Sequence, residues 1–375
     1  MDNLTHTLFA VTLARTPLGR AGRGTTTALV LASNAPDIDV VTAARGSAAY
    51  LQWHRGPTHG PLGIVGLAVI TAAIVWTIQR VVDRRAATPD ETPSASFGML
   101  MAVSAVGVLG HILMDFPTSY GTRLLSPFSW AWFAADLMPI VDVYLVGALA
   151  AGLLFGSSAG ARRRNAAIVL ALMAANYGVR IAARHEAIAL APRVFGPLLP
   201  QPCDSKGVGS PLVAEWPQPA VEVPPPQSMP GGASRCLADL AAIPSFSSPF
   251  KWRLIARLSN AYELHDIDVL DARLRRPPEA GEAMWRVTTR YPNQWTPAVK
   301  TAATAPVAQT FLGFSRYPAA RWVADSQTGV VTVRWTDMRF ATGMAMDQRI
   351  VRRNLFEATV RVAPDAEVID QRLGQ

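Results

Sequence analysis

Long apolar runs alternate with short arginine-rich segments over the first half of the chain. Residues 61–79 contain no charged side chain, and in residues 92–114 His111 is the only titratable group. Each run is long enough to cross a bilayer as a helix. Two further runs of this kind cover 143–161, directly after Asp142, and 165–183, where Arg180 falls near the end. The pattern therefore predicts four long membrane-spanning helices.

Two shorter apolar segments, 4–18 and 25–36, precede these runs, and we expect them to enter the bilayer partly or to pack inside the bundle. If the chain passes alternately through all six segments, its three arginine clusters fall on one side. Arginine-rich loops are typical of the cytoplasmic side. The N-terminus, the loops 37–60 and 115–140, and everything after about residue 184 are then predicted to be extracytoplasmic. The clusters are Arg15, Arg20 and Arg23; Arg80, Arg84 and Arg85; and Arg162, Arg163 and Arg164.

The second half of the chain has a different pattern. Residues 191–245 are rich in proline and predict a linker or an irregular connection. After about residue 246, segments such as FKWRLIARL, VVTVRW and LFEATVRVA are rich in β-branched and aromatic residues and partly alternate, with turn signals such as DSQTG between them. We therefore predict a mainly α-helical transmembrane bundle over 1–190, a linker over 191–245, and a smaller β-rich (α+β) domain over 246–375.

The composition agrees with a membrane protein, although by itself it excludes few other classes of protein. Half of the residues are hydrophobic, 17% are charged, and the formal net charge is +8. No dense stripe of basic and aromatic residues accompanies this charge, so we expect no nucleic-acid partner. The first residues lack the basic segment and long apolar core of a cleavable signal peptide. The two cysteines, Cys203 and Cys236, can form one disulfide if their segment is extracytoplasmic, and are otherwise two thiols.

Candidate chemistry gathers where the apolar segments end. The chain contains six histidines; four of them lie in three short polar clusters, and a fourth cluster supplies two aspartates. By the predicted orientation all of these clusters face the extracytoplasmic side, where titratable groups at membrane depth are functional by default. The clusters are NLTHT with His6, NAPDIDV with Asp37 and Asp39, HRGPTHG with His54 and His59, and GHILMDFPTSYGT with His111 and Asp115.

Each cluster alone has an ordinary structural explanation. His111 and Asp115 are four residues apart and share a helix face, which suits two ligands of one metal, a histidine held by a carboxylate, or a plain hydrogen bond. PDID is also typical of a helix end. Together, however, imidazoles and carboxylates from separated segments on one membrane face are what a Zn²⁺ or Mn²⁺ site needs. We predict His6, Asp37, His54, His59, His111 and Asp115 as ligands of one or two divalent ions; His185 and His265 have no such companions.

The motifs NLTHTL, APDIDV, HRGPTHG and GHILMDFPTSYGTRLLSPFS resemble those of the membrane-bound metal-dependent hydrolases of the YdjM/YbcI type, a bacterial family, over about residues 1–190. Their order also resembles the ligand order of zinc phospholipase C and P1 nuclease. The resemblance implies that His6, Asp37 or Asp39, His59, His111 and Asp115 are ligands, with Asp115 as a bridge. This chain lacks an obvious further His/His/Glu set, so the resemblance does not extend to a full three-zinc site.

These observations predict a membrane-bound hydrolase of the bacterial inner membrane that uses a metal-activated water on a phosphoester or lipid-like substrate. Asp39 is the predicted general base if Asp37 is the ligand. Arg55 is predicted to pair with a substrate phosphate, or otherwise with a lipid headgroup, and Arg123 is a second candidate on the same side. The alternatives are a metal-binding or transporting membrane protein without catalysis, and a membrane anchor for the later domain.

Overall fold

The computed structural model describes residues 1–85, 92–195, 200, 202–203, 211–216, 236–272, 289–341 and 356–374. These residues form two compact units, each of which is described by itself. The helical unit comprises Met1–Val41 and Trp53–Ile181, and the β unit comprises Thr42–Gln52 and Ala182–Gln375.

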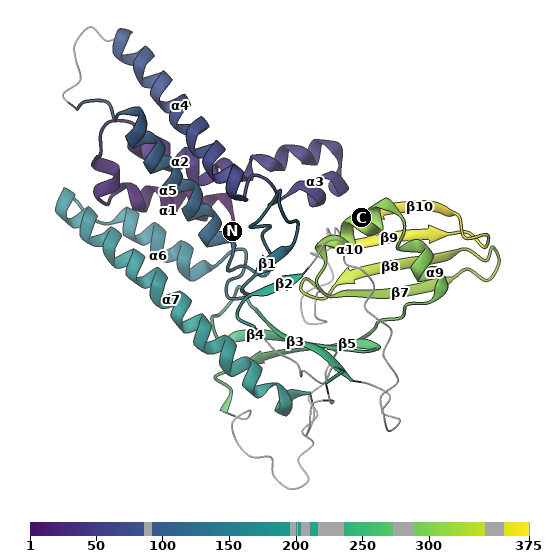
Figure 1. Cartoon of the computed structure of the whole chain (residues 1–375). Helices are drawn as coiled ribbons and strands as arrows, with labels where there is room; N and C mark the ends of the chain where they lie inside the picture. The colour runs from purple at the N-terminus through teal and green to yellow at the C-terminus, as the bar shows by residue number, and fades with distance from the viewer. Residues whose placement is uncertain are drawn as a thin grey trace. The chain divides into compact units, whose positions relative to one another are not determined.

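Helices form almost all of the helical unit (Figure 1). Three of them are long and apolar enough to cross a membrane: α4 (Pro61–Arg85), α5 (Phe97–Asp115) and α7 (Ala159–Val194), whose last residues belong to the β unit. The shorter elements are α1 (Asn3–Ala14), η1 (Pro17–Arg20), α2 (Thr25–Asn34), η2 (Ala35–Arg45), α6 (Val143–Leu154) and the strand β1 (Trp132–Ala134). The last residues of η2 and almost all of helix α3 (Ser47–Trp53) belong to the β unit.

The predicted span at 143–161 is wrong in its length. Helix α6 ends at Leu154 and counts among the shorter apolar helices. Gly156 has a φ of 110°, a left-handed conformation that ends the helix. Ser158 then begins α7, because its Oγ accepts a hydrogen bond from the backbone nitrogen of Ala161.

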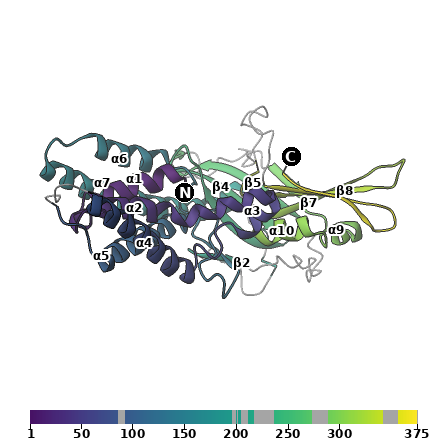
Figure 2. The ribbon, with the colours of Figure 1, turned by 90° about the horizontal axis from the view of Figure 1, so that it is seen from above.

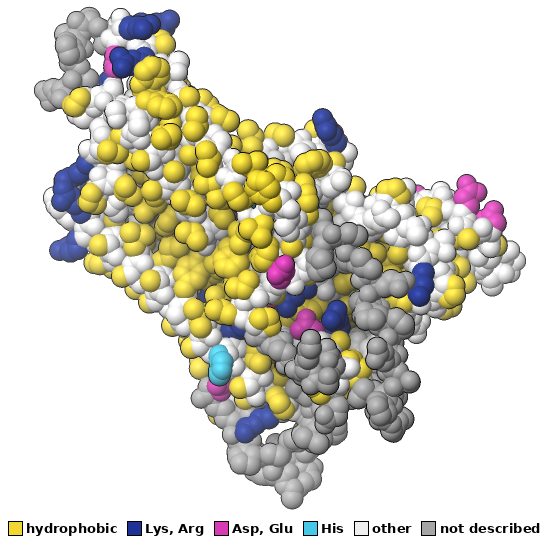
Figure 3. All heavy atoms as spheres, in the orientation of Figure 1, with side chains coloured by type: hydrophobic (Ala, Val, Ile, Leu, Met, Phe, Trp, Pro, Cys, Tyr) yellow, Lys and Arg dark blue, Asp and Glu magenta, His cyan; other side chains and the backbone are white. Residues whose placement is uncertain are grey.

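The lateral surface of this unit is apolar. Leu62, Val65, Ile70, Ile74 and Ile78 follow one another along α4 and are all about half exposed or more. Figure 3 shows hydrophobic side chains over the visible face of the helices, while basic side chains gather at the end of α4 and the start of α7. A surface of this kind is expected where lipid replaces water.

The helices alternate in direction, which gives the unit two distinct ends. At one, which we name the arginine end, Arg23 forms an ion pair with Asp83 near the end of α4. Arg15 donates there to the carbonyl oxygens of Gly152 and Leu153, at 2.9 and 2.8 Å, near the end of α6. The starts of α1, α4 and α6 and the ends of α2 and α5 lie at the other end, which holds all of the predicted site residues.

A glycine allows α2 and α5 to pack closely near that other end. A Cβ atom on Gly107 would lie 2.8 Å from the Cβ of Ala32 and 3.1 Å from the carbonyl oxygen of Leu29. Any larger residue would therefore push the two helices apart. This contact holds Ser33, near the end of α2, beside the last turn of α5.

The β unit contains two four-stranded antiparallel sheets, both with simple meander order. The first has the order β3-β4-β5-β6, and the second has the order β10-β9-β8-β7. Figure 2 labels β4 and β5 of the first sheet and β7 and β8 of the second. The strands are β3 (Leu237–Pro244), β4 (Lys251–Leu258), β5 (Ala261–Asp268), β6 (Thr289–Pro292), β7 (Pro318–Ala324), β8 (Val331–Asp337), β9 (Glu357–Val362) and β10 (Val368–Leu373), and the short strand β2 covers Ala214–Trp216. Together with the helical unit, these sheets confirm the predicted fold class.

The first sheet buries side chains on both of its faces, because Leu254 and Ile255 of β4 are both fully buried and belong to different core clusters. Trp252, Leu254 and Ala256 of β4 pack with Ala187 and Ala191 in the last turns of α7. Helices α9 (Pro297–Ala302) and α10 (Pro306–Phe314) cover one face of the second sheet. The opposite face of that sheet carries arginine, threonine and glutamate side chains.

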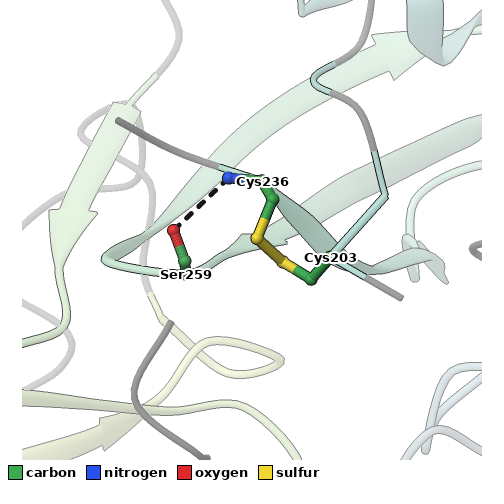
Figure 4. Close-up of a disulfide and its surroundings, with 3 residues drawn as sticks. All are labelled: Cys203, Cys236 and Ser259. Atoms are coloured by element: carbon green, nitrogen blue, oxygen red, sulfur yellow. Dashed lines mark hydrogen bonds between the residues drawn. A yellow bond between two sulfur atoms is a disulfide. The ribbon is translucent and has the colours of Figure 1, made fainter. Parts of the chain in front are cut away.

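Cys203 and Cys236 form a disulfide in this unit (Figure 4). The backbone nitrogen of Cys236 donates to Ser259 Oγ at 3.3 Å, which joins the bridge to the end of β4. Strands β2 and β3 fall within the range 191–245 that we predicted as a linker; its most proline-rich part, 217–235, lies outside the described residues.

Candidate metal centre

Four acidic and imidazole side chains converge at the end of the helical unit opposite the arginine end. Ligand atoms of Asp37, His59, His111 and Asp115 all lie within 4.8 Å of one another. Asp37 comes from η2, His59 from the loop before α4, and His111 and Asp115 from the last turns of α5. The side chains of His59, His111 and Asp115 are fully buried, whereas Asp37 is 14% exposed, so the cluster reaches the surface at Asp37.

The helical spacing explains the pair on α5. Residues four apart on an α-helix project from the same face, and His111 Nε2 lies 3.4 Å from Asp115 Oδ2. The second ring nitrogen, His111 Nδ1, lies 2.7 Å from the carbonyl oxygen of Ser33. A carbonyl oxygen only accepts, so His111 Nδ1 carries the proton and Nε2 is an acceptor.

The same reasoning fixes the proton on His59. Thr58 Oγ1 lies 3.2 Å from Asp39 Oδ2 and 3.0 Å from His59 Nδ1. A carboxylate only accepts, so the threonine hydroxyl donates to Asp39 and accepts from His59 Nδ1–H. His59 Nε2 therefore also turns a lone pair toward the cluster.

Acceptor atoms thus face one another with no proton between them. His59 Nε2 lies 3.2 Å from His111 Nε2, and each lies 3.4 Å from Asp115 Oδ2. Asp37 Oδ1 lies 3.5 Å from His111 Nε2 and 3.9 Å from His59 Nε2. Lone pairs and negative charge at these distances repel one another unless a cation lies among them. Two imidazole nitrogens and two carboxylate oxygens are a donor set that suits Zn²⁺ or Mn²⁺, so the residues fit a divalent ion.

The other oxygen of Asp115 faces a different set of groups. Asp115 Oδ1 forms ion pairs with Arg55 Nη2, at 3.0 Å, and with the backbone nitrogen of Met1, and it lies 3.4 Å from His6 Nε2. The His6 ring stacks on the His111 ring with 3.8 Å between centroids. Neither ring nitrogen of His6 has a hydrogen-bond partner, although the ring is fully buried. His6 therefore lies beside the four-residue cluster, with Asp115 between them.

His54 and Asp39 form a separate pair. His54 Nδ1 lies 2.9 Å from Asp39 Oδ1, and Asp39 Oδ2 accepts from the backbone nitrogen of Arg55 at 2.7 Å. Asp39 is thereby held on both oxygens, and it holds His54 in turn. Among the described residues, His54 does not belong to the converging group of ligand atoms.

Arg55 is buried and adopts a strained backbone conformation, with a φ of 52°. A non-glycine residue in this region costs energy that the surrounding contacts must offset. Its guanidinium donates to Thr118 Oγ1 and to the carbonyl oxygen of Gly121, at 3.1 and 3.2 Å, in addition to the pair with Asp115. Arg123 is fully buried, with its guanidinium 4.2 Å from the Trp132 ring centroid.

Burial sets the charge state of the ligands outside the predicted spans. It lowers the pKa of His59 well below the usual value and also lowers the pKa of His6, so both rings are neutral. Burial by itself raises the pKa of Asp37, but the nearby positive charge, above all that of Arg55, outweighs it and lowers that pKa. Neutral imidazoles beside an ionised carboxylate are the protonation states that metal binding requires.

Sequence reasoning named all four converging residues and missed several of their supports. Ser33 and Thr58 fix the protonated nitrogens of His111 and His59, and Thr118 holds Arg55. Thr58 and Thr118 lie inside the motifs HRGPTHG and MDFPTSYGT, which was the available signal. Ser33 acts through its backbone carbonyl, for which the sequence carries no signal.

Two comparisons with known proteins match parts of this chain. An alignment of 118 residues is 30% identical to the uncharacterized protein YfhP of Bacillus subtilis (strain 168), and it spans 32% of this chain and 32% of that protein. No solved structure matches the chain. Residues 1–187, which contain every residue of the candidate metal centre, match the model of the YdjM inner membrane protein family. Over these residues the chain belongs to the YdjM inner membrane protein family.

Proposed function

We propose that this protein is a membrane-bound metal-dependent hydrolase that cleaves a phosphoester or lipid-like substrate at the extracytoplasmic face of the inner membrane. The observation that carries the proposal is the pair of unprotonated nitrogens, His59 Nε2 and His111 Nε2, which lie 3.2 Å apart between two carboxylates. A buried cluster of acceptors without donors is costly unless it binds a cation.

In this proposal Asp37, His59, His111 and Asp115 hold the ion. A divalent ion bound there supplies Lewis-acid activation of a water and of the scissile bond. Arg55 orients Asp115 through its ion pair, and it neutralises the charge on the oxygen of Asp115 that faces away from His59 and His111. His6 is the candidate ligand for a second ion, with Asp115 as the bridge.

The Asp39–His54 pair is the candidate general base. A carboxylate that accepts from one nitrogen of an imidazole fixes its tautomer and orients the ring. Asp39 then acts through His54 rather than on the substrate directly. This changes the roles predicted from the sequence, in which His54 was a ligand and Asp39 the base.

The surroundings of the site support an amphiphilic substrate. Ile38, Val40 and Val41 are 57%, 55% and 65% exposed, and they adjoin Asp37, the one ligand that reaches the surface. Phe128 is 76% exposed on the loop that follows α5. Apolar side chains exposed around a charged site suit a molecule with a polar headgroup and an apolar chain.

Two observations support the extracytoplasmic location. The arginine end is opposite to the metal centre, and arginine-rich loops remain in the cytoplasm. The disulfide between Cys203 and Cys236 is the second, because disulfides persist in oxidising compartments.

Hydrolysis assays on detergent-purified protein test the proposal. The probes are bis(4-nitrophenyl) phosphate and phosphatidylglycerol in mixed micelles, each assayed with Zn²⁺, with Mn²⁺ and with a chelator. We expect metal-dependent cleavage of at least one probe, lost in His59→Ala and retained in the control His185→Ala, whose exposed histidine lies on α7 outside the cluster. Bound metal without cleavage of either probe would favour a metal-binding protein that is not an enzyme.

A further inference from the structure

The second sheet of the β unit has one face that α9 and α10 do not cover. On the covered face, Val333, Trp335 and Val360 are completely buried. The strand alternation turns Arg321 of β7 and Arg334 of β8 to the other face, where both are exposed. A pocket of about 370 Å³ lies on that face, lined by residues that include Arg321, Arg334, Thr332, Thr336, Tyr291 and Glu357.

Two arginines stand directly opposite each other in this pocket. In the antiparallel register of β7 and β8, Arg321 is the partner of Arg334. Side chains at directly opposed positions have their Cβ atoms about 5 Å apart, and like charges there destabilise the sheet. The Arg321–Arg334 pair therefore does not stabilise the sheet, and we ask which other group it could bind.

One contact orients the guanidinium group of each arginine. The Arg321 guanidinium stacks over the Tyr291 ring, 5.0 Å from the centroid. Arg334 Nε donates to Glu357 Oε1 at 2.7 Å. Both guanidinium groups are thereby oriented without being fully used, because five N–H groups are available on each.

The carboxylates available to the pair do not balance it. Within the described part of the chain, Glu357 is the one acidic residue that lines the pocket, and Arg321 has no carboxylate partner there. Burial raises the pKa of Glu357, while Arg334 and the hydrogen bond from Thr336 act in the opposite direction. The pocket therefore has an excess of positive charge at a fixed geometry.

We propose that this pocket binds a phosphate group, with Arg321 and Arg334 as its two clamps. A phosphate offers several acceptor oxygens, and two arginines can each bind it in the bidentate manner that suits their planar geometry. The hydroxyl group of Thr332 adds a short donor beside them, whereas that of Thr336 already donates to Glu357. The volume is that of a small-molecule site, so the pocket accepts a phosphate that carries a further group. The inference is independent of the hydrolase proposed for the helical unit.

Thermal melting of the full-length protein in detergent, titrated with inorganic phosphate, tests the site. We expect saturable stabilisation of the wild type and at least about tenfold weaker binding by Arg321→Gln, because one of two charge-assisted clamps is lost. Without phosphate, Arg321→Gln should melt at the same temperature as the wild type or higher, since the like-charge contact is removed. That second readout separates a lost ligand from a damaged fold.

Two further variants sharpen the test. Arg361→Gln is the matched control, because Arg361 points to the same face but interacts with Asp325 and Asp370; it should bind phosphate like the wild type. Glu357→Gln should bind phosphate more tightly, since the competing carboxylate is gone.

Equal stabilisation of the wild type and Arg321→Gln by phosphate would overturn the proposal, and so would weaker binding by Glu357→Gln. Parallel titrations with glycerol phosphate and with phosphatidylglycerol in mixed micelles distinguish the source of the phosphate. A response to glycerol phosphate supports a soluble phosphoester, and a response confined to the micelles supports a lipid headgroup. If Arg321→Gln leaves every one of these responses unchanged, the pocket is not a phosphate site.

Discussion

His59 Nε2 and His111 Nε2 lie 3.2 Å apart, and both are lone-pair acceptors because their Nδ1 atoms donate to Thr58 and Ser33. Two such nitrogens do not hydrogen-bond to each other. They are instead arranged as two ligands of one cation, with the carboxylates of Asp37 and Asp115 completing the set.

The first prediction is that the purified protein carries a divalent metal that depends on these residues. Elemental analysis of detergent-purified wild type should find at least one ion per chain, and His59→Ala and His111→Ala should lose it. His185→Ala is the control and should keep the full amount. Two ions per chain, with one of them lost in His6→Ala, would support the bimetal arrangement. Wild-type amounts of metal in His59→Ala would disprove the site.

The second prediction concerns Arg55 and its pair with Asp115. Arg55→Gln removes the guanidinium that pairs with the buried carboxylate of Asp115, and breaking a buried ion pair in this way costs about 3–5 kcal/mol. It also removes the group that orients Asp115, and the loss of such a support lowers metal affinity about 10–100-fold. Thermal melting and competitive metal titration measure the two effects.

Arg55→Lys is the informative companion variant. Lysine keeps the charge but cannot donate at once to Asp115, Thr118 and Gly121 as the guanidinium does. We therefore expect it to recover part of the stability and less of the metal affinity. If both variants bind metal like the wild type, Arg55 has no role in holding the site.

The fold class followed from the sequence because its signals are local. An uncharged run of about twenty residues predicts a membrane span from its own composition. His111 and Asp115 are four residues apart, so they share a face as soon as their segment is helical, whatever the rest of the fold. The length of α6 did not follow, since Gly156 and Ser158 end one helix and begin the next inside a continuous apolar run. Strand β3 was also missed, because its apolar residues lie in a range that is mostly rich in proline.

The site was predictable as a set of residues but not as an arrangement. Asp37 and Asp39 are two residues apart in one motif, and the sequence gives no reason to separate their roles. In the structure Asp37 faces the two histidines, whereas Asp39 turns to His54 and the backbone of Arg55. That division depends on how η2 packs against the loop before α4, which is a property of the tertiary structure.

The third prediction separates Asp39 and His54 from the metal ligands. If His54 is the general base of the proposed hydrolase, His54→Gln should lower kcat by about 10²–10⁴-fold while metal content stays unchanged. Asp39→Asn should lower kcat less, because Asp39 only orients His54 and fixes its tautomer. Metal lost in His54→Gln would instead return this histidine to the ligand set.

The fourth prediction concerns the disulfide between Cys203 and Cys236, whose sequence separation is 33. Closing a loop of this length stabilises a fold by roughly 4 kcal/mol through the unfolded chain. The double variant Cys203→Ser with Cys236→Ser should therefore melt at a lower temperature than the wild type, and reductant should lower the wild type to the same point. Metal content should not change, since both cysteines lie in the β unit.

The same two cysteines report on the side of the membrane. A cytosolic pair is kept reduced, whereas a pair in the periplasm or outside the cell stays oxidised. Intact cells treated with a permeant maleimide should therefore leave both cysteines unlabelled unless a reductant is added first. Labelling without reductant would place the β unit in the cytoplasm. Because the candidate span α7 lies between the arginine end and the β unit, the arginine end would then be extracytoplasmic. That result would overturn the orientation on which the extracytoplasmic site depends.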